Sequence, residues 1–190
     1  MHQRRGKGFL LAAALFLAAA APAGAQEPAG PRINILRPEA RGSDVFIEFN
    51  VTGALNPELA RKIEAGLETA IRYEIRLYRR FPYWVDESLD IRRYRVAVTY
   101  DPVTQEYVVH ETMDGKPLRR ATTRDFAEAA RSLVSRKGLL VFHVGRNKPR
   151  RNLYVMMRAR FDTGFLFTII PVDSKTPWKK SRRFNIRETR

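Results

Sequence analysis

Residues 71–79, IRYEIRLYR, and residues 94–109, YRVAVTYDPVTQEYVV, decide the fold class of this 190-residue chain. Apolar side chains occupy every second position, from Ile71 to Leu77 and again from Tyr94 to Tyr100. That period of two is typical of strands with one face buried and the other in water. We expect one common core lined by Tyr73, Ile75, Leu77, Tyr94, Val96, Val98 and Tyr107.

A pattern of the form YD-x-x-T-x-x-Y joins the two halves of the second stretch. Asp101 and Thr104 are residue types whose side chains hydrogen bond within turns, and the proline after Asp101 fixes φ. Tyr100 and Tyr107 flank the turn and are expected to pack across the two strands. We interpret these four residues as a structural hairpin rather than a functional motif.

Further apolar or alternating stretches extend the strand pattern to both sides. They predict strands at residues 45–51, 139–144, 153–161 and 165–172, with Phe184 and Ile186 closing the pattern. Strand follows strand through mostly short connections, which favours an antiparallel arrangement. We therefore predict a mainly β (α+β) domain over residues 32–190. Its expected form is an antiparallel β-sandwich or open barrel of about eight strands, with two short amphipathic helices packed beside it.

Capping signals place the two helices. Asn56 followed by proline is an N-cap with proline at the first helical position, and the apolar spacing extends to about Thr69. Thr122 or Thr123 is expected to cap the second helix, and Gly138 to stop it.

The first 25 residues predict export. A basic start precedes 13 apolar residues at positions 9–21, and Ala23-Gly24-Ala25 supplies the small residues of a cleavage site. The apolar run is shorter than the roughly 20 residues of a membrane-spanning helix. We expect a signal peptide over residues 1–25, a flexible leader over 26–31, and no transmembrane span after cleavage. The protein is then periplasmic in a Gram-negative bacterium, or secreted.

Few residue types point to chemistry. The chain contains no cysteine, which excludes disulfides, iron–sulfur clusters and thiolate zinc sites. His110 and His143 fall in predicted strands without a second ligand at metal-binding spacing. Nucleophile elbows and glycine-rich phosphate loops are absent from the sequence. We therefore expect no metal, no cofactor and no enzymatic activity.

One acidic cluster leaves an enzymatic alternative open. Asp86, Glu87 and Asp90 lie in a connection next to Trp84. Paired carboxylates beside an aromatic ring are the residues that a glycoside- or peptidoglycan-cleaving enzyme uses. An envelope hydrolase therefore stays an alternative, although acidic neighbours in a connection more often only solvate a turn.

Charge is the most unusual property of the sequence. The formal net charge is +15, and residues 147–190 hold 12 Lys/Arg against 3 Asp/Glu, whereas residues 26–146 hold 20 against 17. Clustered cations attract anions and steer partners, although they also keep proteins soluble. Because an exported protein rarely meets nucleic acid, we expect a lipid headgroup, lipopolysaccharide or an acidic protein as partner. The candidate binding residues are Arg146, Lys148, Arg150, Arg151, Lys175, Trp178, Lys179, Lys180, Arg182 and Arg183.

The chain also resembles a known family. The run AGLETAIRYEIRLYRR, the segment Tyr83-Trp84-Val85-Asp86 and the YD-x-x-T-x-x-Y hairpin are similar to the bacterial family called domain of unknown function 4390. The resemblance covers nearly all of residues 32–188, but the tryptophan-rich patch is reduced to Tyr83 and Trp84, and the final strand is more basic. It implies an exported envelope protein, often encoded beside a two-component sensor kinase, which would be a further partner.

Together these observations favour a non-catalytic binding or accessory module in the cell envelope. Two alternatives remain at this stage: the hydrolase using Asp86, Glu87 or Asp90, and a β-barrel carrier of a small apolar ligand. An apolar cavity would favour the carrier, converging carboxylates would favour the hydrolase, and a filled core with a basic surface would favour the binding module.

Overall fold

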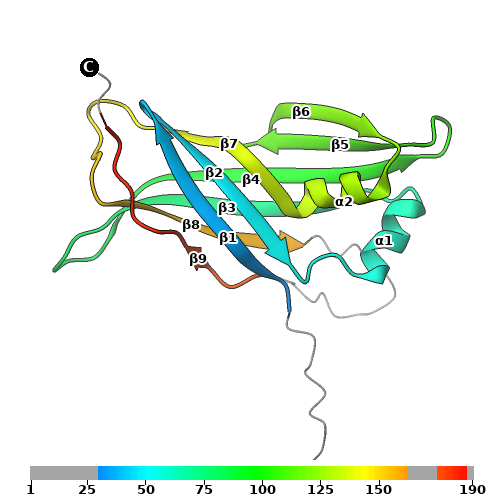
Figure 1. The fold of residues 1–190 in the computed structure, drawn as a ribbon, viewed down its shortest axis with the longest axis horizontal. Helices are drawn as coiled ribbons and strands as arrows, with labels where there is room; N and C mark the ends of the chain where they lie inside the picture. The colour runs from blue at the N-terminus through cyan, green and yellow to red at the C-terminus, as the bar shows by residue number, and fades with distance from the viewer. Residues whose placement is uncertain (1–29, 162–174, 188–190) are drawn as a thin grey trace, which may run out of the picture.

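The computed structural model describes residues 30–161 and 175–187, which form two packed antiparallel sheets (Figure 1). The smaller sheet has the order β1-β2-β7, with bounds Arg32–Arg41, Asp44–Thr52 and Ser135–His143. The larger sheet has the order β6-β5-β4-β3-β8-β9. Its strands, in chain order, are β3 (Thr69–Arg79), β4 (Glu87–Asp101), β5 (Glu106–Met113), β6 (Lys116–Thr123), β8 (Leu153–Phe161) and β9 (Lys179–Lys180).

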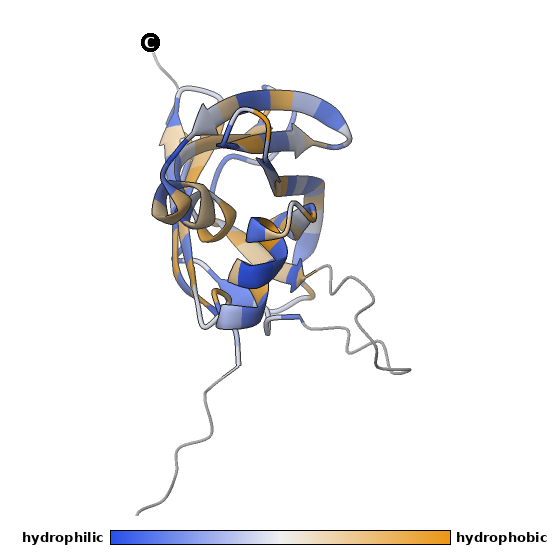
Figure 2. Cartoon of the chain, turned by 90° about the vertical axis from the view of Figure 1, so that its right-hand side faces the viewer, coloured by the Kyte–Doolittle hydropathy of each residue, from blue (hydrophilic) through white to orange (hydrophobic). Residues whose placement is uncertain are grey.

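This architecture confirms the predicted antiparallel sandwich. Every strand pair in the described part of the chain is antiparallel, and the two sheets do not close into a barrel. The helices α1 (Pro57–Glu64) and α2 (Phe126–Val134) both lie in the right-hand half of Figure 1, with α1 nearer the end. Figure 2 shows the molecule from that right-hand side.

The predicted core is confirmed. Tyr73 pairs with Tyr94 across β3 and β4, and both side chains are 1% exposed. Their ring centroids are 5.9 Å apart, and Phe49 of the opposite sheet lies 4.8 Å from Tyr73 and 6.2 Å from Tyr94. Such aromatic contacts fill the space between the sheets and stabilise the sandwich beyond simple burial. The other predicted core residues are also buried, except Tyr107, which is half-buried and packs against the core.

The predicted hairpin forms between β4 and β5. Tyr100 pairs with Tyr107, their ring centroids 4.9 Å apart. Asp101 Oδ1 accepts hydrogen bonds from the backbone N–H groups of Val103, at 2.9 Å, and Thr104, at 3.4 Å. These bonds lower the pKa of Asp101, because they favour its charged form.

Helix boundaries differ from the prediction. The first helix ends at Glu64 rather than near Thr69, because Gly66 adopts a left-handed φ of 75° and the chain turns into β3. The second helix is capped by Asp125, whose carboxylate accepts from the Ala127 N–H at 2.8 Å. Thr122 and Thr123 belong to β6 instead, because both pair with β5.

Gly138 is not a helix stop. Helix α2 ends at Val134, β7 begins at Ser135, and Gly138 lies inside β7 with a φ of 62°. The register between β2 and β7 shifts next to it, between Ile47 and Phe49. A glycine with positive φ inside a strand is typical of such an irregularity.

Three strands were not predicted: β1, β6 and the two-residue β9. The closing strand expected at Phe184 and Ile186 is not formed, because Phe184 makes only an isolated bridge to Leu153. All of β6 is exposed or half-buried, so it lacks the one-sided apolar alternation that marks a half-buried strand. β1 contains Pro38, and its register with β2 shifts between Ile33 and Ile35, which interrupts its alternation. β4 also begins earlier than expected, at Glu87.

Three predictions concern segments for which the structure gives no description. The signal peptide over residues 1–25, residues 26–29 of the leader over 26–31, and the strand over 165–172 lie outside the described residues. Within the described ranges, none of the helices has the length and apolar character to cross a membrane.

Candidate anion-binding surfaces

Two segments on either side of β8 in the sequence lie together at the left-hand end of the molecule in Figure 1, away from the helices. We call this surface the basic end and define it as residues 144–152, between β7 and β8, and residues 181–187, after β9. These segments hold seven cations and no acidic residue. The cations are Arg146, Lys148, Arg150, Arg151, Arg182, Arg183 and Arg187, all exposed except Arg150, which is half-buried.

Backbone hydrogen bonds hold the two segments together. The Ile186 N–H donates to the Arg150 carbonyl at 2.8 Å, and the Asn152 N–H donates to Asn185 Oδ1 at 2.8 Å. Ile186 is buried, so the second segment is packed against the fold. The structure therefore brings together the cluster at 146–151 and the pair Arg182 and Arg183.

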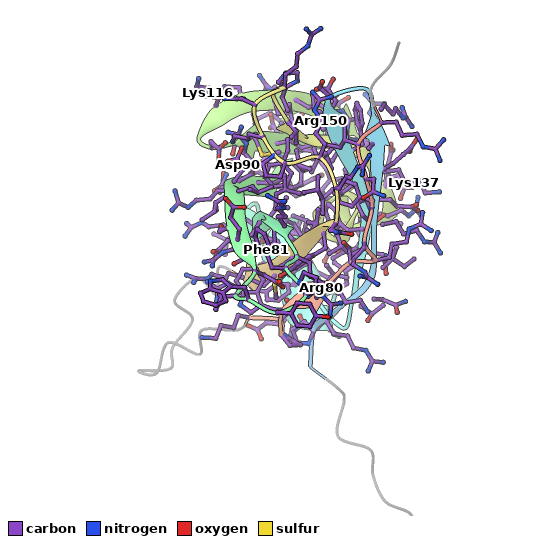
Figure 3. The ribbon with its side chains drawn as sticks, turned by 90° about the vertical axis from the view of Figure 1, so that its left-hand side faces the viewer. Arg80, Phe81, Asp90, Lys116, Lys137 and Arg150 are labelled. Atoms are coloured by element: carbon purple, nitrogen blue, oxygen red, sulfur yellow. The ribbon has the colours of Figure 1, made fainter. Side chains whose placement is uncertain are left out.

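Arg150 has a local structural role within the basic end. One guanidinium nitrogen donates to Ser43 Oγ at 3.1 Å and to the Val144 carbonyl at 3.3 Å. Arg150 and Arg151 also line an open hollow of about 700 Å³, together with Asn185, Ile186 and Arg187. Figure 3 shows this end of the molecule. It labels Arg150, in the connection between β7 and β8, and Arg80, in the connection between β3 and β4.

The remaining predicted binding residues lie along β8 instead. Lys175 pairs with Arg160, and Lys179 and Lys180 form β9 opposite Met157 and Met156. Trp178 is half-buried, and its ring lies 4.9 Å from the guanidinium of Arg76 and 4.5 Å from that of Arg158. The second sequence cluster is thus split: Arg182 and Arg183 lie at the basic end, whereas Lys175, Lys179 and Lys180 lie along β8 at the edge of the large sheet.

That outer face carries a second set of cations, which we call the arginine face. Arg72 of β3 pairs with Arg95 of β4 on one side and with Arg160 of β8 on the other. Three arginines therefore stand in one row across three strands, an arrangement that is unfavourable unless anions lie nearby. The face surrounds a hollow of about 540 Å³, whose charged lining residues are Arg72, Glu74, Arg93, Arg95, Arg158 and Arg160.

Two carboxylates act as internal counter-ions of the arginine face: Glu68, which pairs with Arg95, and Glu74. Glu74 is the more connected of the two. It accepts hydrogen bonds from Arg158, at 2.6 and 3.0 Å, and from Arg76 Nε at 2.7 Å. Burial acts to raise the pKa of Glu74, but the bonds from Arg158 and Arg76 outweigh it, and the net shift is downward. Glu74 is therefore ionised at neutral pH and offsets part of the arginine charge.

The connection between β3 and β4 projects beyond the basic end as a narrow loop (Figure 1). Its outermost residues, Tyr83, Trp84 and Val85, are 96%, 83% and 82% exposed, and we call them the aromatic tip. The base of the loop is held firmly by Asp86. One carboxylate oxygen accepts from the Tyr154 hydroxyl at 2.6 Å, and the other accepts from the Phe81 N–H at 3.2 Å.

The acidic cluster does not converge. Asp90 pairs with Leu77, whose side chain is buried inside the sandwich, whereas Asp86 binds Tyr154 on the outer side of the same sheet. Glu87 is exposed and stands opposite Arg79. Both histidines lie in strands as predicted, and His143 Nδ1 is 2.7 Å from Asp44 Oδ1. Across residues 30–161 and 175–187, no three His, Asp or Glu side chains are grouped as a metal site would need.

A buried polar cluster links the large sheet to β7. Glu111 is 2% exposed, accepts from the Tyr94 hydroxyl at 2.9 Å and from Arg119 at 2.9 Å, and lies 3.6 Å from Arg136 Nε. Burial and the Glu111 charge both raise the pKa of Tyr94. The ion pairs satisfy the buried carboxylate, so the cluster has a structural role.

Sequence reasoning did not find the arginine face. The outward positions Arg72 and Arg76 follow from the alternation, but strand register decides which cations become neighbours. The repeated arginines at 92–95 and 158–160 were the available signal.

Residues 29–166 match the sequence profile of the family described as Domain of unknown function (DUF4390). The chain belongs to this family. The match spans the chain from just before β1 to just after β8 and confirms the resemblance carried by the hairpin and the arginine strand. The basic end draws its second segment, residues 181–187, from beyond the matched region. Neither a curated protein nor a solved structure matches the chain significantly.

Proposed function

We propose that this protein is an exported, non-catalytic binding module that holds an anionic component of the cell envelope against its basic end. The observation that carries the proposal is the meeting of two segments that together hold seven cations and no acidic residue. Because their potentials add, they attract multiply charged ligands more strongly than either segment alone. The shared ligand chemistry is a phosphate group, supplied either by phospholipid headgroups or by lipopolysaccharide.

The interior of the sandwich supports a binding module over a carrier. Tyr73, Tyr94, Phe49 and Phe142 fill the space between the sheets, and each is at most 1% exposed. The acidic cluster gives the hydrolase alternative no geometric support, because Asp86 and Asp90 belong to opposite sides of one sheet. A paired acid and base would have to face a common substrate.

Charge removal with a matched control tests the proposal. One variant replaces Arg146, Lys148, Arg151 and Arg183 with glutamine, and a control variant replaces Arg61, Arg120, Arg131 and Lys137, which are exposed on other elements. Both lose the same charge. Co-sedimentation is measured with phosphatidylcholine vesicles, with vesicles containing phosphatidylglycerol, and with vesicles containing lipopolysaccharide. The last two distinguish the sources of phosphate.

We expect the basic-end variant to bind anionic vesicles up to about a thousandfold more weakly, because each of its four lost cations contributes about 1 kcal/mol near an anionic surface and about 1.4 kcal/mol is tenfold in affinity. The control should retain most of the binding. Parent binding should also weaken as salt rises from about 0.1 M to about 1 M, where the Debye length falls from about 10 to about 3 Å. Equal losses in the two variants, or equal binding to neutral and anionic vesicles, would refute a specific role for the basic end.

A further inference from the structure

The aromatic tip is an unusual feature for a protein surface. Tyr83, Trp84 and Val85 are consecutive, and more than four-fifths of each is exposed to solvent. Single exposed apolar residues are common, but adjacent large ones at the end of a projecting loop mark interaction sites. The hydrogen bonds to Phe81 and Tyr154 that hold the loop are made by Asp86 at its base, not by the three residues of the tip.

The basic end lies directly beside this loop. The Arg80 N–H donates to the Asn152 carbonyl at 2.9 Å, which joins the loop to the β7–β8 connection. The Lys148 Nζ reaches the Leu89 carbonyl at 3.4 Å, a second tie between the same connection and β4. Two amphipathic rings and a valine are therefore exposed beside a surface rich in exposed cations. Figure 3 labels Arg80 and Phe81, which precede the aromatic tip in the same connection.

We propose that the aromatic tip inserts into the interfacial region of an anionic lipid bilayer, with the basic end resting on the headgroups. Tryptophan and tyrosine are favoured at that depth, because their rings meet the acyl boundary while their polar atoms stay hydrated. Neighbouring cations add attraction to anionic headgroups. This inference rests on the proposed function and selects one partner, a lipid surface.

Charge complementarity alone would fit an acidic protein equally well. The aromatic tip favours a lipid partner. An acidic polypeptide would bind the cations but would leave the exposed rings of the tip without a role. The loop is also built to keep its shape. Arg79 lies 4.6 Å over the Phe81 ring, and Lys180 lies 3.6 Å from Asp86, so the base is braced from both sides. A braced base allows the tip to enter a membrane with little loss of conformational freedom.

Tryptophan fluorescence tests the insertion directly. The chain has two tryptophans, so Trp178→Phe leaves Trp84 as the only reporter. The probe is a vesicle of phosphatidylcholine and phosphatidylglycerol whose acyl chains carry bromine at defined depths. We expect a blue shift of Trp84 emission and strongest quenching by bromine near the headgroups. Because residues 1–25 contain no tryptophan, the signal reports the tip whether or not that segment has been removed.

A tip variant, Tyr83→Ser/Trp84→Ser/Val85→Ser, should partition at least about tenfold more weakly into the same vesicles, because burial of even one large apolar side chain is worth about 1.5–3 kcal/mol and about 1.4 kcal/mol is tenfold. Val103→Ser is the control, since Val103 is 90% exposed in the β4–β5 turn at the other end. Folding of each variant is verified by its thermal transition.

The outcomes separate the two proposals. If anionic vesicles bind the protein through the basic end but Trp84 is not quenched, the insertion is refuted and the proposed function stands. If Trp84 is quenched equally in neutral vesicles and the basic-end variant binds as well as the parent, the insertion stands and the anionic preference fails. If the tip variant and the Val103→Ser control partition alike, the tip does not insert.

Discussion

The hydroxyl of Tyr154, on β8, donates a hydrogen bond of 2.6 Å to Asp86, in the connection between β3 and β4. Tyr154 is buried and stacks on Tyr78 with ring centroids 5.3 Å apart, and the Lys180 ammonium lies 3.7 Å from the Tyr154 ring centroid. The hydrogen bond from Tyr154 lowers the pKa of Asp86, as do the Phe81 N–H and the Lys180 charge. This pair therefore fixes the loop that carries the aromatic tip next to the basic end.

Removing the Tyr154 hydroxyl should loosen that loop without unfolding the sheet. In Tyr154→Phe the ring stack with Tyr78 is preserved, but Asp86 loses its strongest partner. We expect the Phe81 amide, which donates to Asp86, to exchange with solvent about tenfold faster, as loss of one hydrogen bond to a charged group implies. Hydrogen exchange read residue by residue measures this. Unchanged protection at Phe81 would show that the pair does not brace the loop.

Truncation inside the sandwich should be costly. Ile75 is fully buried in β3, so Ile75→Ala should lower the free energy of unfolding by about 2–5 kcal/mol. Ile91 stands on the neighbouring strand and is 44% exposed, which makes Ile91→Ala a matched control with a cost below about 1 kcal/mol. Denaturant titration compares them. Similar costs at the two positions would contradict the register of β3 and β4.

Alkaline pH should destabilise the fold through its buried tyrosines. Burial raises the pKa of Tyr73 above its ordinary value, and burial together with Glu111 does so for Tyr94. The folded state then holds protons that the unfolded state releases. The stabilising effect is complete below the unfolded pKa of about 10 and declines above it, by about 1.4 kcal/mol per pH unit for each such tyrosine.

The Tyr73→Phe variant isolates one of these contributions. It loses the 2.5 Å hydrogen bond to the Leu133 carbonyl, so it should be less stable than the parent at neutral pH. Above about pH 10, however, its stability should fall less steeply, because one titrating group is gone. Unfolding free energies measured at several pH values give both slopes. Parallel slopes for parent and variant would count against the burial of the Tyr73 hydroxyl.

Most of the strands could be predicted from local sequence, because a strand with one buried face has an apolar residue at every second position. Tyr73, Ile75 and Val96 are buried where alternation placed them. β6 was not predicted because both of its faces are exposed or half-buried, so its sequence shows no apolar alternation. The N-cap at Asp125 was not predicted because Thr122 and Thr123, the expected caps, pair with β5 as part of β6. Local patterns do not contain those tertiary constraints.

The sequence predicted that cations are concentrated near the C-terminus, but it did not predict which of them lie together on one surface. The excess of arginine and lysine near the C-terminus is plain in the sequence, and the cluster at 146–151 does lie at the basic end. Which cations become neighbours depends on register and on the path of residues 175–187 along β8. Trp178 shows the difference, because its place among lysines in the sequence suggested a binding ring, whereas its partners in the fold are Arg76 and Arg158.

Export gives a prediction that is independent of the fold. A basic start, an apolar run and Ala23-Gly24-Ala25 predict cleavage after Ala25. Sequencing of the protein recovered from the envelope fraction should begin at Gln26. Recovery of the full-length chain in the membrane would show instead that residues 1–25 are retained as an anchor.

Photo-crosslinking in intact cells tests most directly whether the basic end contacts a phosphate-bearing component of the envelope. A photo-reactive amino acid replaces Arg183 in one variant and Val103, at the opposite end of the molecule, in another. Crosslinked products are separated and identified by mass spectrometry. The proposal predicts adducts with phosphate-bearing lipid or lipopolysaccharide from position 183 and few or none from position 103. The same products from both positions, or only adducts with protein from position 183, would contradict it.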